Sequence, residues 1–267
     1  MKTKFLCSVL VLSAFIFSCK KKDTTPDPNT GGGGTPAPTY VISKDSTYDG
    51  TANNTQVRIF EYNSNKKLVK VKQKYGTMAA FNNWDTIIYN NSGQVAKVES
   101  YTSGLSAAQK TCTYTFTGGY LANVVEAGKN DSGAYVRTRN FTYVSGKLSA
   151  VSLTYTTGKD DKNGGPSNMT AIVFNGNNIS SADLTGYGVV TITSDLTAAN
   201  PYYGLYFDSE DFINLFNQNN ILKAYLAATP TQIFVDNTYT YADGRVATVV
   251  DASQSPARTT VITYKSL

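Results

Sequence analysis

The stretch Tyr241-Ala242-Asp243-Gly244-Arg245-Val246-Ala247-Thr248-Val249 decides the fold, because its pattern occurs six times along the chain. An aromatic residue precedes a short polar turn, an apolar residue follows the turn, and a small apolar residue comes three positions later. Turns that contain Asp-Gly, Ser-Gly or Asn-Gly tolerate positive φ and are typical of tight hairpin connections. Each copy therefore predicts a β-hairpin.

The copies recur with a regular spacing. They start at Tyr62, Tyr89, Phe116, Tyr143, Phe174 and Tyr241. The first apolar residues are Leu68, Val95, Leu121, Leu148, Ile179 and Val246, and the second are Val71, Val98, Val124, Val151, Ala182 and Val249. The first four copies are 27 residues apart, at positions 62, 89, 116 and 143. Such a period indicates a supersecondary unit that packs against its neighbours.

Sequential hairpins favour an antiparallel meander, since elements adjacent in sequence tend to be adjacent in space. With opening and closing strands at 40–48 and 258–265, we expect about fourteen strands in one all-β domain, residues 40–267. A sheet of that length must twist and curl, so we predict a curled open sheet or half-barrel. A closed barrel and a two-sheet sandwich are the alternatives.

The period breaks between the fifth and sixth copies. Asp208 or Ser209 can cap a helix there, with apolar residues on one stripe behind it. Residues 221–228 continue as a second short helical stretch. We therefore predict a helical insertion at about 200–228, packed on the concave side of the sheet.

Composition excludes several classes of function. The formal charge of +5 includes five lysines in and just after the leader, so the body is close to neutral and gives no electrostatic case for nucleic acid. The chain has no histidine, the commonest general base and metal ligand. No Gly-x-Ser-x-Gly, phosphate-binding loop or zinc spacing is present. We predict no enzyme, no catalytic residues, no metal site and no cofactor.

The N-terminus has the features of a secretory leader. Two lysines precede the apolar run 5–17, which is too short to remain as a membrane-spanning helix, so residues 1–18 are predicted to be a signal peptide. The residues Ile16-Phe17-Ser18-Cys19 resemble a bacterial lipobox, which implies that Cys19 is lipidated and becomes the first mature residue. An ordinary signal peptide is the alternative. Residues 19–39, rich in Gly and Pro, are predicted to be a flexible stalk.

Tyrosine-rich segments are the candidate ligand-binding residues. Tyr202, Tyr203 and Tyr206 could line a cleft between insertion and sheet, or be buried beneath it. The single tryptophan, Trp84, fits either the core or a sugar-stacking platform. Cys112 shares a strand face with aromatic residues, which predicts a buried structural thiol.

The repeated phrase and the order of segments along the chain each resemble a known group of proteins. Tyr241-Ala242-Asp243-Gly244-Arg245-Val246 resembles the tyrosine-aspartate (YD, or RHS-type) repeat, although most copies lack its Asp or Arg. The order of lipobox, stalk, hairpins and an Asn-Pro-Tyr-Tyr-Gly-Leu insertion resembles Bacteroidota outer-envelope lipoproteins of unknown function. The resemblance implies a β-rich domain in the cell envelope and no activity. A lysine directly after the lipidated cysteine, here Lys20, resembles the pattern of lipoproteins that are sent to the outer membrane. The domain could then face either the periplasm or the cell surface.

These observations predict a membrane-anchored, non-enzymatic lipoprotein that acts, as a monomer, as a binding module for a glycan, peptide or protein partner. A scaffold without a small ligand is the alternative, and a glycosidase-like enzyme that uses Asp208, Glu210 and Asp211 is a third reading. Lys and Glu occur too often on the predicted strand faces for contact with lipid, which argues against an outer-membrane pore.

Overall fold

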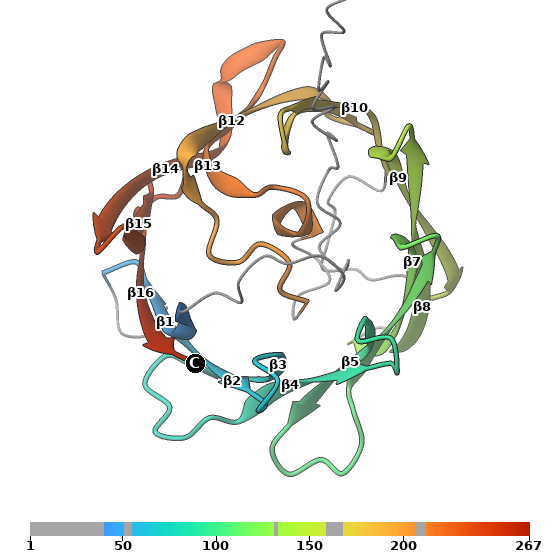
Figure 1. Ribbon diagram of the computed structural model, residues 1–267, viewed down its shortest axis with the longest axis vertical. Helices are drawn as coiled ribbons and strands as arrows, with labels where there is room; N and C mark the ends of the chain where they lie inside the picture. Colours follow the sequence, from blue (N-terminus) through green and yellow to red (C-terminus); the bar gives the residue numbers. More distant parts are fainter. Residues whose placement is uncertain (1–39, 51–54, 131–132, 159–167, 207–211) are drawn as a thin grey trace, which may run out of the picture.

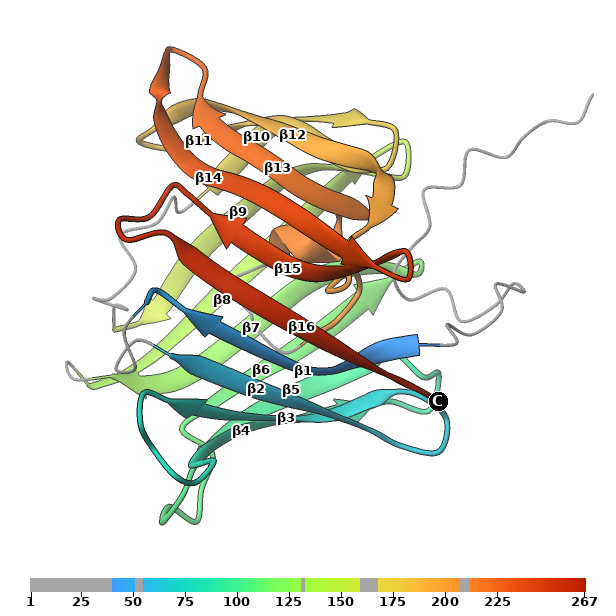
Figure 2. The same ribbon diagram turned by 90° about the vertical axis from the view of Figure 1, so that its left-hand side faces the viewer.

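The computed structural model describes residues 40–50, 55–130, 133–158, 168–206 and 212–267. The predicted signal peptide, Cys19 and the stalk lie outside these residues. The described strands form one closed antiparallel barrel, in which each strand pairs with the next in sequence and β1 pairs with β16 (Figure 1). Figure 2 shows the strands crossing the wall obliquely, with the C-terminus at the end of the barrel where β1 begins.

The elements, in chain order, are β1 (Tyr40–Tyr48), β2 (Gln56–Tyr62), β3 (Leu68–Tyr75), β4 (Asn83–Tyr89), β5 (Val95–Thr102), β6 (Lys110–Thr117), β7 (Tyr120–Asn130), β8 (Gly133–Val144), β9 (Lys147–Thr157), β10 (Asn168–Asn175), β11 (Asn178–Leu184), β12 (Gly188–Ala199), the 3₁₀ turn η2 (Phe212–Leu215), β13 (Asn219–Leu226), β14 (Thr229–Ala242), β15 (Arg245–Asp251) and β16 (Arg258–Ser266).

Each copy of the repeated phrase is a hairpin that carries a β-bulge. The aromatic residue pairs with the first apolar residue, as Tyr62 does with Leu68, and the register then shifts by one. The same shift follows in the other five hairpins. In a regular strand, residues three apart face opposite sides. The extra residue of the bulge turns both apolar positions to the same side, so Leu68 and Val71 are both buried.

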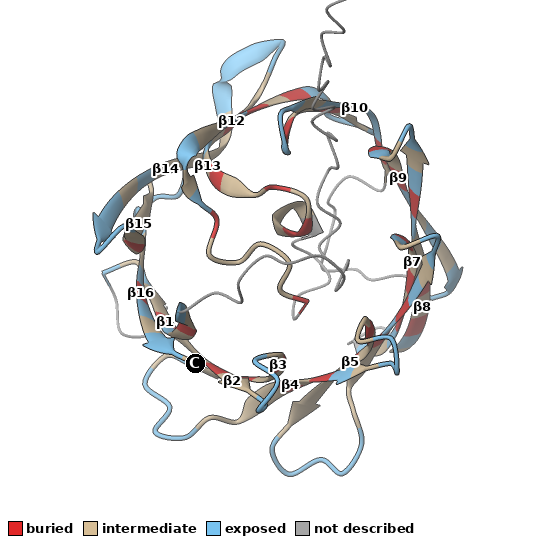
Figure 3. Cartoon of the chain, in the orientation of Figure 1, coloured by how far each residue is buried: buried red, intermediate tan, exposed pale blue. Residues whose placement is uncertain are grey.

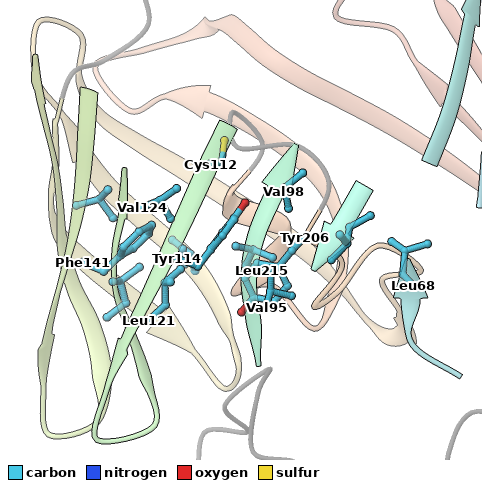
Figure 4. Packing of buried hydrophobic residues seen from close by; sticks show 14 of the residues in the cluster. Leu68, Val95, Val98, Cys112, Tyr114, Leu121, Val124, Phe141, Tyr206 and Leu215 are labelled. Carbon is cyan, nitrogen blue, oxygen red and sulfur yellow. The ribbon is translucent and has the colours of Figure 1, made fainter. Parts of the chain in front are cut away.

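The buried apolar side chains form one cluster inside the barrel, part of which is drawn in Figure 4. Figure 3 marks the buried residues along the strands of the wall and on the segment inside it. Porins with a comparable number of strands enclose an aqueous channel. Here the chain between β12 and β13 enters the lumen, and we call its described residues, 200–206 and 212–218, the plug (Figure 1). Tyr206 and Leu215 of the plug are buried in the same cluster as the wall residues Tyr114 and Phe141.

The predicted open sheet or half-barrel is wrong, because β1 and β16 pair along eight positions and close the wall. Closure is favoured physically, since an open sheet would leave the N–H and C=O groups of both terminal strands unpaired. The all-β class and the sequential antiparallel pairing were predicted correctly.

The predicted helical insertion is also wrong. Most of 221–228 belongs to β13, which pairs with β12 on one side and β14 on the other. A short apolar run is ambiguous between helix and strand, and the two neighbouring strands decide it here. The described part of the plug contains the 3₁₀ turn Phe212–Leu215 in place of the expected helix.

The outer face of the wall is largely polar. On β3, Lys70 and Lys72 alternate with the buried Val71, so the lysines point away from the lumen. Lys72 pairs with Glu61 of β2, and Lys97 with Glu99 of β5. On β6, Thr113 and Thr115 are exposed beside the buried Cys112 and Tyr114. Some apolar side chains, such as Val189, are exposed as well, and the buried residues include charged ones such as Glu126.

Candidate ligand-binding site

The plug is shaped by its own asparagines. The side chain of Asn200 accepts a hydrogen bond from the backbone N–H of Tyr202 at 3.0 Å. Its amide nitrogen donates to the carbonyl oxygen of Asn217 at 3.0 Å and to Oδ1 of Asn214 at 2.9 Å. Asn217, fully buried, accepts from the backbone N–H of Ile179 in β11 at 2.8 Å. These bonds join the two ends of the plug and tie it to the wall.

A charged cluster holds the plug to the opposite wall. Asp45 of β1 is 1% exposed, and Nε and Nη2 of Arg58 donate to its carboxylate at 2.6 to 3.1 Å. The hydroxyl of Tyr202 donates to the same carboxylate at 2.7 Å. Burial, followed by the charge of Asp45, raises the pKa of Tyr202 well above its ordinary value. The phenol thus stays protonated and remains a donor at neutral pH.

A cavity of about 600 Å³ lies between the plug and the wall. Its lining comes from the first strand, β1, and the last, β16, from the plug, and from the turn ends of the first, second and sixth repeats. Aromatic rings dominate the lining. The tyrosines are Tyr40, Tyr62, Tyr89, Tyr203, Tyr206, Tyr241 and Tyr264. A cavity of this size, apolar with a few polar groups, is typical of small-ligand sites.

Cations lie against several of these rings. The Arg245 guanidinium is 4.1 Å from the ring centre of Tyr40 and 5.6 Å from that of Tyr264. Lys67 Nζ is 4.8 Å from the ring centre of Tyr89. At these distances the positive charge is attracted to the negative face of the ring. The cations are thus held at the cavity without leaving solvent completely.

Burial raises the pKa of several tyrosines that line the cavity. Burial raises the pKa of Tyr89 to about 12, and its hydroxyl donates to the carbonyl oxygen of Leu68 at 2.8 Å. Burial likewise raises the pKa of Tyr264 to about 12, against a smaller lowering by Arg245. At the edge of the cavity, the Tyr241 hydroxyl donates to Asp195 at 2.6 Å. The rings therefore offer neutral hydroxyls as well as apolar faces.

A second cavity of about 250 Å³ lies on the other side of the segment from Asn200 to Tyr202. Side chains from Asn214, Asn220 and Asn237 contribute to its lining together with Arg58. The Asp45 cluster closes one side of it, through Arg58 and Tyr202.

The structure separates the predicted site residues. Tyr203 and Tyr206 both line the large cavity, Tyr206 as a buried residue whose ring meets Tyr114 edge to face at 5.4 Å. Tyr202 lines the smaller cavity and anchors the plug. Trp84 lies apart from them, stacked on Tyr101 at 5.6 Å.

Sequence reasoning missed the wall's contribution to the cavity. Tyr62, Tyr89 and Tyr241, which the sequence identifies only as the aromatic residues of the repeat, line the cavity. Their shared place before each turn was a usable signal, because it puts them at one end of the barrel. Cys112 is buried as predicted, with its thiol 3.8 Å from Glu126.

Among the described residues, no group of three or more Cys, Asp or Glu side chains is placed to hold a metal ion. The described part of the chain has no helix of the length and hydropathy needed to cross a bilayer. Asp208, Glu210 and Asp211, the acids of the glycosidase-like alternative, fall outside the described residues.

The fold and site define a plugged, closed antiparallel barrel with a tyrosine-lined cavity. A porin-like protein from Bacteroides uniformis has a similar structure, with a TM-score of 0.54 and 17% sequence identity over 85% of this chain and 99% of that one. A porin-like protein from Bacteroides vulgatus matches over the same shares at 11% identity and a TM-score of 0.36. No protein-family model and no curated protein sequence matches the chain.

The likeness to the Bacteroides uniformis protein shows a shared fold, and the second TM-score is too low to carry an argument. The Bacteroides uniformis protein comes from the Bacteroidota, the group named in the resemblance found in the sequence. The YD-type repeat and the lipid anchor stay predictions.

Proposed function

We propose that this chain is a lipid-anchored protein of the bacterial envelope whose plugged barrel binds a glycan and neither conducts solutes nor catalyses a reaction. The tyrosine-lined cavity between plug and wall is the observation that carries the proposal. A β-barrel with porin-like structural neighbours fits a membrane or envelope protein. The predicted signal peptide and Cys19 supply the attachment, and two or more acyl chains suffice for a stable anchor.

The polarity of the wall supports a barrel outside the bilayer. Transmembrane barrels present an apolar band to lipid and a polar lumen. In this barrel Val71 and Phe141 belong to an apolar cluster that fills much of the interior, beside paired groups such as Asp45, and Lys70 and Lys72 lie on the outer face of the wall. A charged side chain at the bilayer midplane costs about 2–4 kcal/mol in such barrels.

The chemistry of the cavity supports a glycan. Tyrosine rings can stack on the apolar faces of sugar rings while hydroxyl groups exchange hydrogen bonds with the sugar. Tyr203 comes from the plug and Tyr62 and Tyr89 from the wall, so rings stand on both sides of the space. A ligand there would replace water between two surfaces that the fold already holds in place.

Glycan binding is tested with a glycan array and with calorimetry on the lipidated, full-length protein in detergent. We expect binding to be lost in Tyr203→Ala and retained in Trp84→Ala, because Tyr203 lines the cavity and Trp84 does not. Loss in Trp84→Ala alone would move the site to the outer wall. Binding of no glycan by wild type would overturn the proposal in favour of a scaffold, and shortening of a bound glycan would overturn the non-enzymatic part.

The placement of the barrel is tested separately. In the Lys72→Cys variant reconstituted in vesicles, a water-soluble maleimide should react with the introduced thiol as fast as it does in detergent. We also expect no conductance in planar bilayers. Protection of the thiol by lipid, together with conductance, would identify a pore. Palmitate labelling that disappears in Cys19→Ser would support the anchor.

A further inference from the structure

We infer that the cavity selects acidic glycans, and that Arg245, Lys66 and Lys67 are the residues that recognise the ligand carboxylates. This inference rests on the proposed glycan binding and specifies its ligand class. Among the described residues that line the cavity, the charged ones are these three, and all are cations. Lys66 and Lys67 lie in the turn between β2 and β3, and Arg245 is the first residue of β15, so the barrel brings all three to the same end.

Arg245 is positioned to bind a carboxylate by donating hydrogen bonds to it. Its guanidinium lies over Tyr40 and is also 5.6 Å from the ring centre of Tyr264, so its plane is supported by aromatic rings. Its ion pair with Asp243 is long, at 3.3 Å, and the Asp243 side chain is 86% exposed. A solvated pair of this kind contributes little. A bidentate carboxylate held on a ring-supported guanidinium would form the stronger interaction.

Lys66 and Lys67 are the other two positive charges that line the cavity. Lys67 Nζ donates to the carbonyl oxygen of Gly93 at 2.7 Å while it lies over the Tyr89 ring, which fixes the ammonium at the cavity. Lys66, in the same turn, adopts a positive φ of 61° and is exposed. Sugar rings that stack on the tyrosines would bring their carboxylates within reach of these groups. Uronic acids are sugars that carry a carboxylate on the ring carbon skeleton, and they satisfy both requirements.

The test compares short oligogalacturonates with their methyl esters, which have the same sugar rings but no charge. Full-length lipidated protein in detergent is titrated by calorimetry at low salt. We expect the acid to bind about tenfold or more tightly than the ester, because the ester loses its charge-assisted hydrogen bonds. In Arg245→Gln and in Lys67→Gln this preference should shrink to about twofold, with ester affinity unchanged. Lys72→Gln, on the outer wall, is the matched control and should keep the full preference.

The outcomes separate this inference from the proposed function. Equal affinity for acid and ester, with both lost in Tyr203→Ala, would overturn the acidic preference and leave glycan binding intact. Preference retained in both cation variants would assign recognition to other residues and overturn the inference. If wild type binds neither the acid nor the ester but does bind neutral glycans on the array, only the inference fails. If it binds no glycan at all, both fail.

Discussion

Replacing Tyr202 by phenylalanine tests how the plug is held in the barrel. The hydroxyl donates at 2.7 Å to Asp45, a carboxylate that is 1% exposed. Hydrogen bonds to charged groups contribute about 1.5–3 kcal/mol. The ring itself stays, with the Arg58 guanidinium 5.4 Å from its centre. We therefore expect Tyr202→Phe to lower the free energy of unfolding by about 1.5–3 kcal/mol.

A double-mutant cycle assigns this loss to the charge of the acceptor. In an Asp45→Asn background the acceptor is neutral, so Tyr202→Phe should cost only about 0.5–1.5 kcal/mol. Urea unfolding followed by the fluorescence of the single tryptophan, Trp84, measures both values. Tyr48→Phe, at a 41% exposed position, is the control and should change stability by less than about 0.5 kcal/mol. An equal cost of Tyr202→Phe in both backgrounds would refute the reasoning.

Four further predictions follow from buried groups. Burial raises the pKa of Tyr89 from 10.0 to about 12, so the stability it contributes is complete below pH 10 and declines as pH rises toward 12; Tyr89→Phe should flatten the alkaline decline seen in unfolding measured against pH. Leu215→Ala, at a 6% exposed plug position, should cost about 2–5 kcal/mol in urea unfolding, and a cost below 1 kcal/mol would mean that the plug is not packed. Arg137→Met removes the guanidinium 2.9 Å from Glu126, which is 3% exposed and keeps the hydrogen bond from Tyr135 at 2.7 Å, and should cost about 3–5 kcal/mol, whereas a neutral result would contradict a net contribution of this ion pair to stability. Cys112, at 2% exposed, should react with a thiol reagent only after unfolding, and reaction in native buffer would contradict its burial.

The sequence predicted the hairpins because their signals are local. Turn residues such as Asp243-Gly244 adopt positive φ, at 50° and 74°, and the flanking aromatic and aliphatic residues alternate as strands do. The bulge was not predicted, although the spacing of three between Leu68 and Val71 contains it. Residues three apart on a regular strand face opposite sides, so two buried residues at this spacing require one extra residue between them.

Closure could not be predicted from local signals. Whether β1 meets β16 depends on the accumulated twist and stagger of all the strands between them, and no single hairpin encodes that sum. The helical expectation for 221–228 failed for a related reason. Ile221 and Ala224 fit a helical stripe, yet Ala224 is buried as an inward-facing strand residue because β12 and β14 flank it. Contacts distant in sequence decided both features.

The position of the cavity follows from how one insertion fills a wide barrel. The plug packs closely against one part of the wall, where Tyr206 meets Tyr114 and Phe216 lies 5.8 Å from Phe141. On another side the plug is joined to β1 and β2 by the hydrogen bond from Tyr202 to Asp45. Cavities remain on both sides of that contact. The described part of the plug leaves a cavity beside the tyrosines that precede the turns of the first, second and sixth repeats. The same repeat rule that builds the wall therefore also supplies the rings that line this cavity.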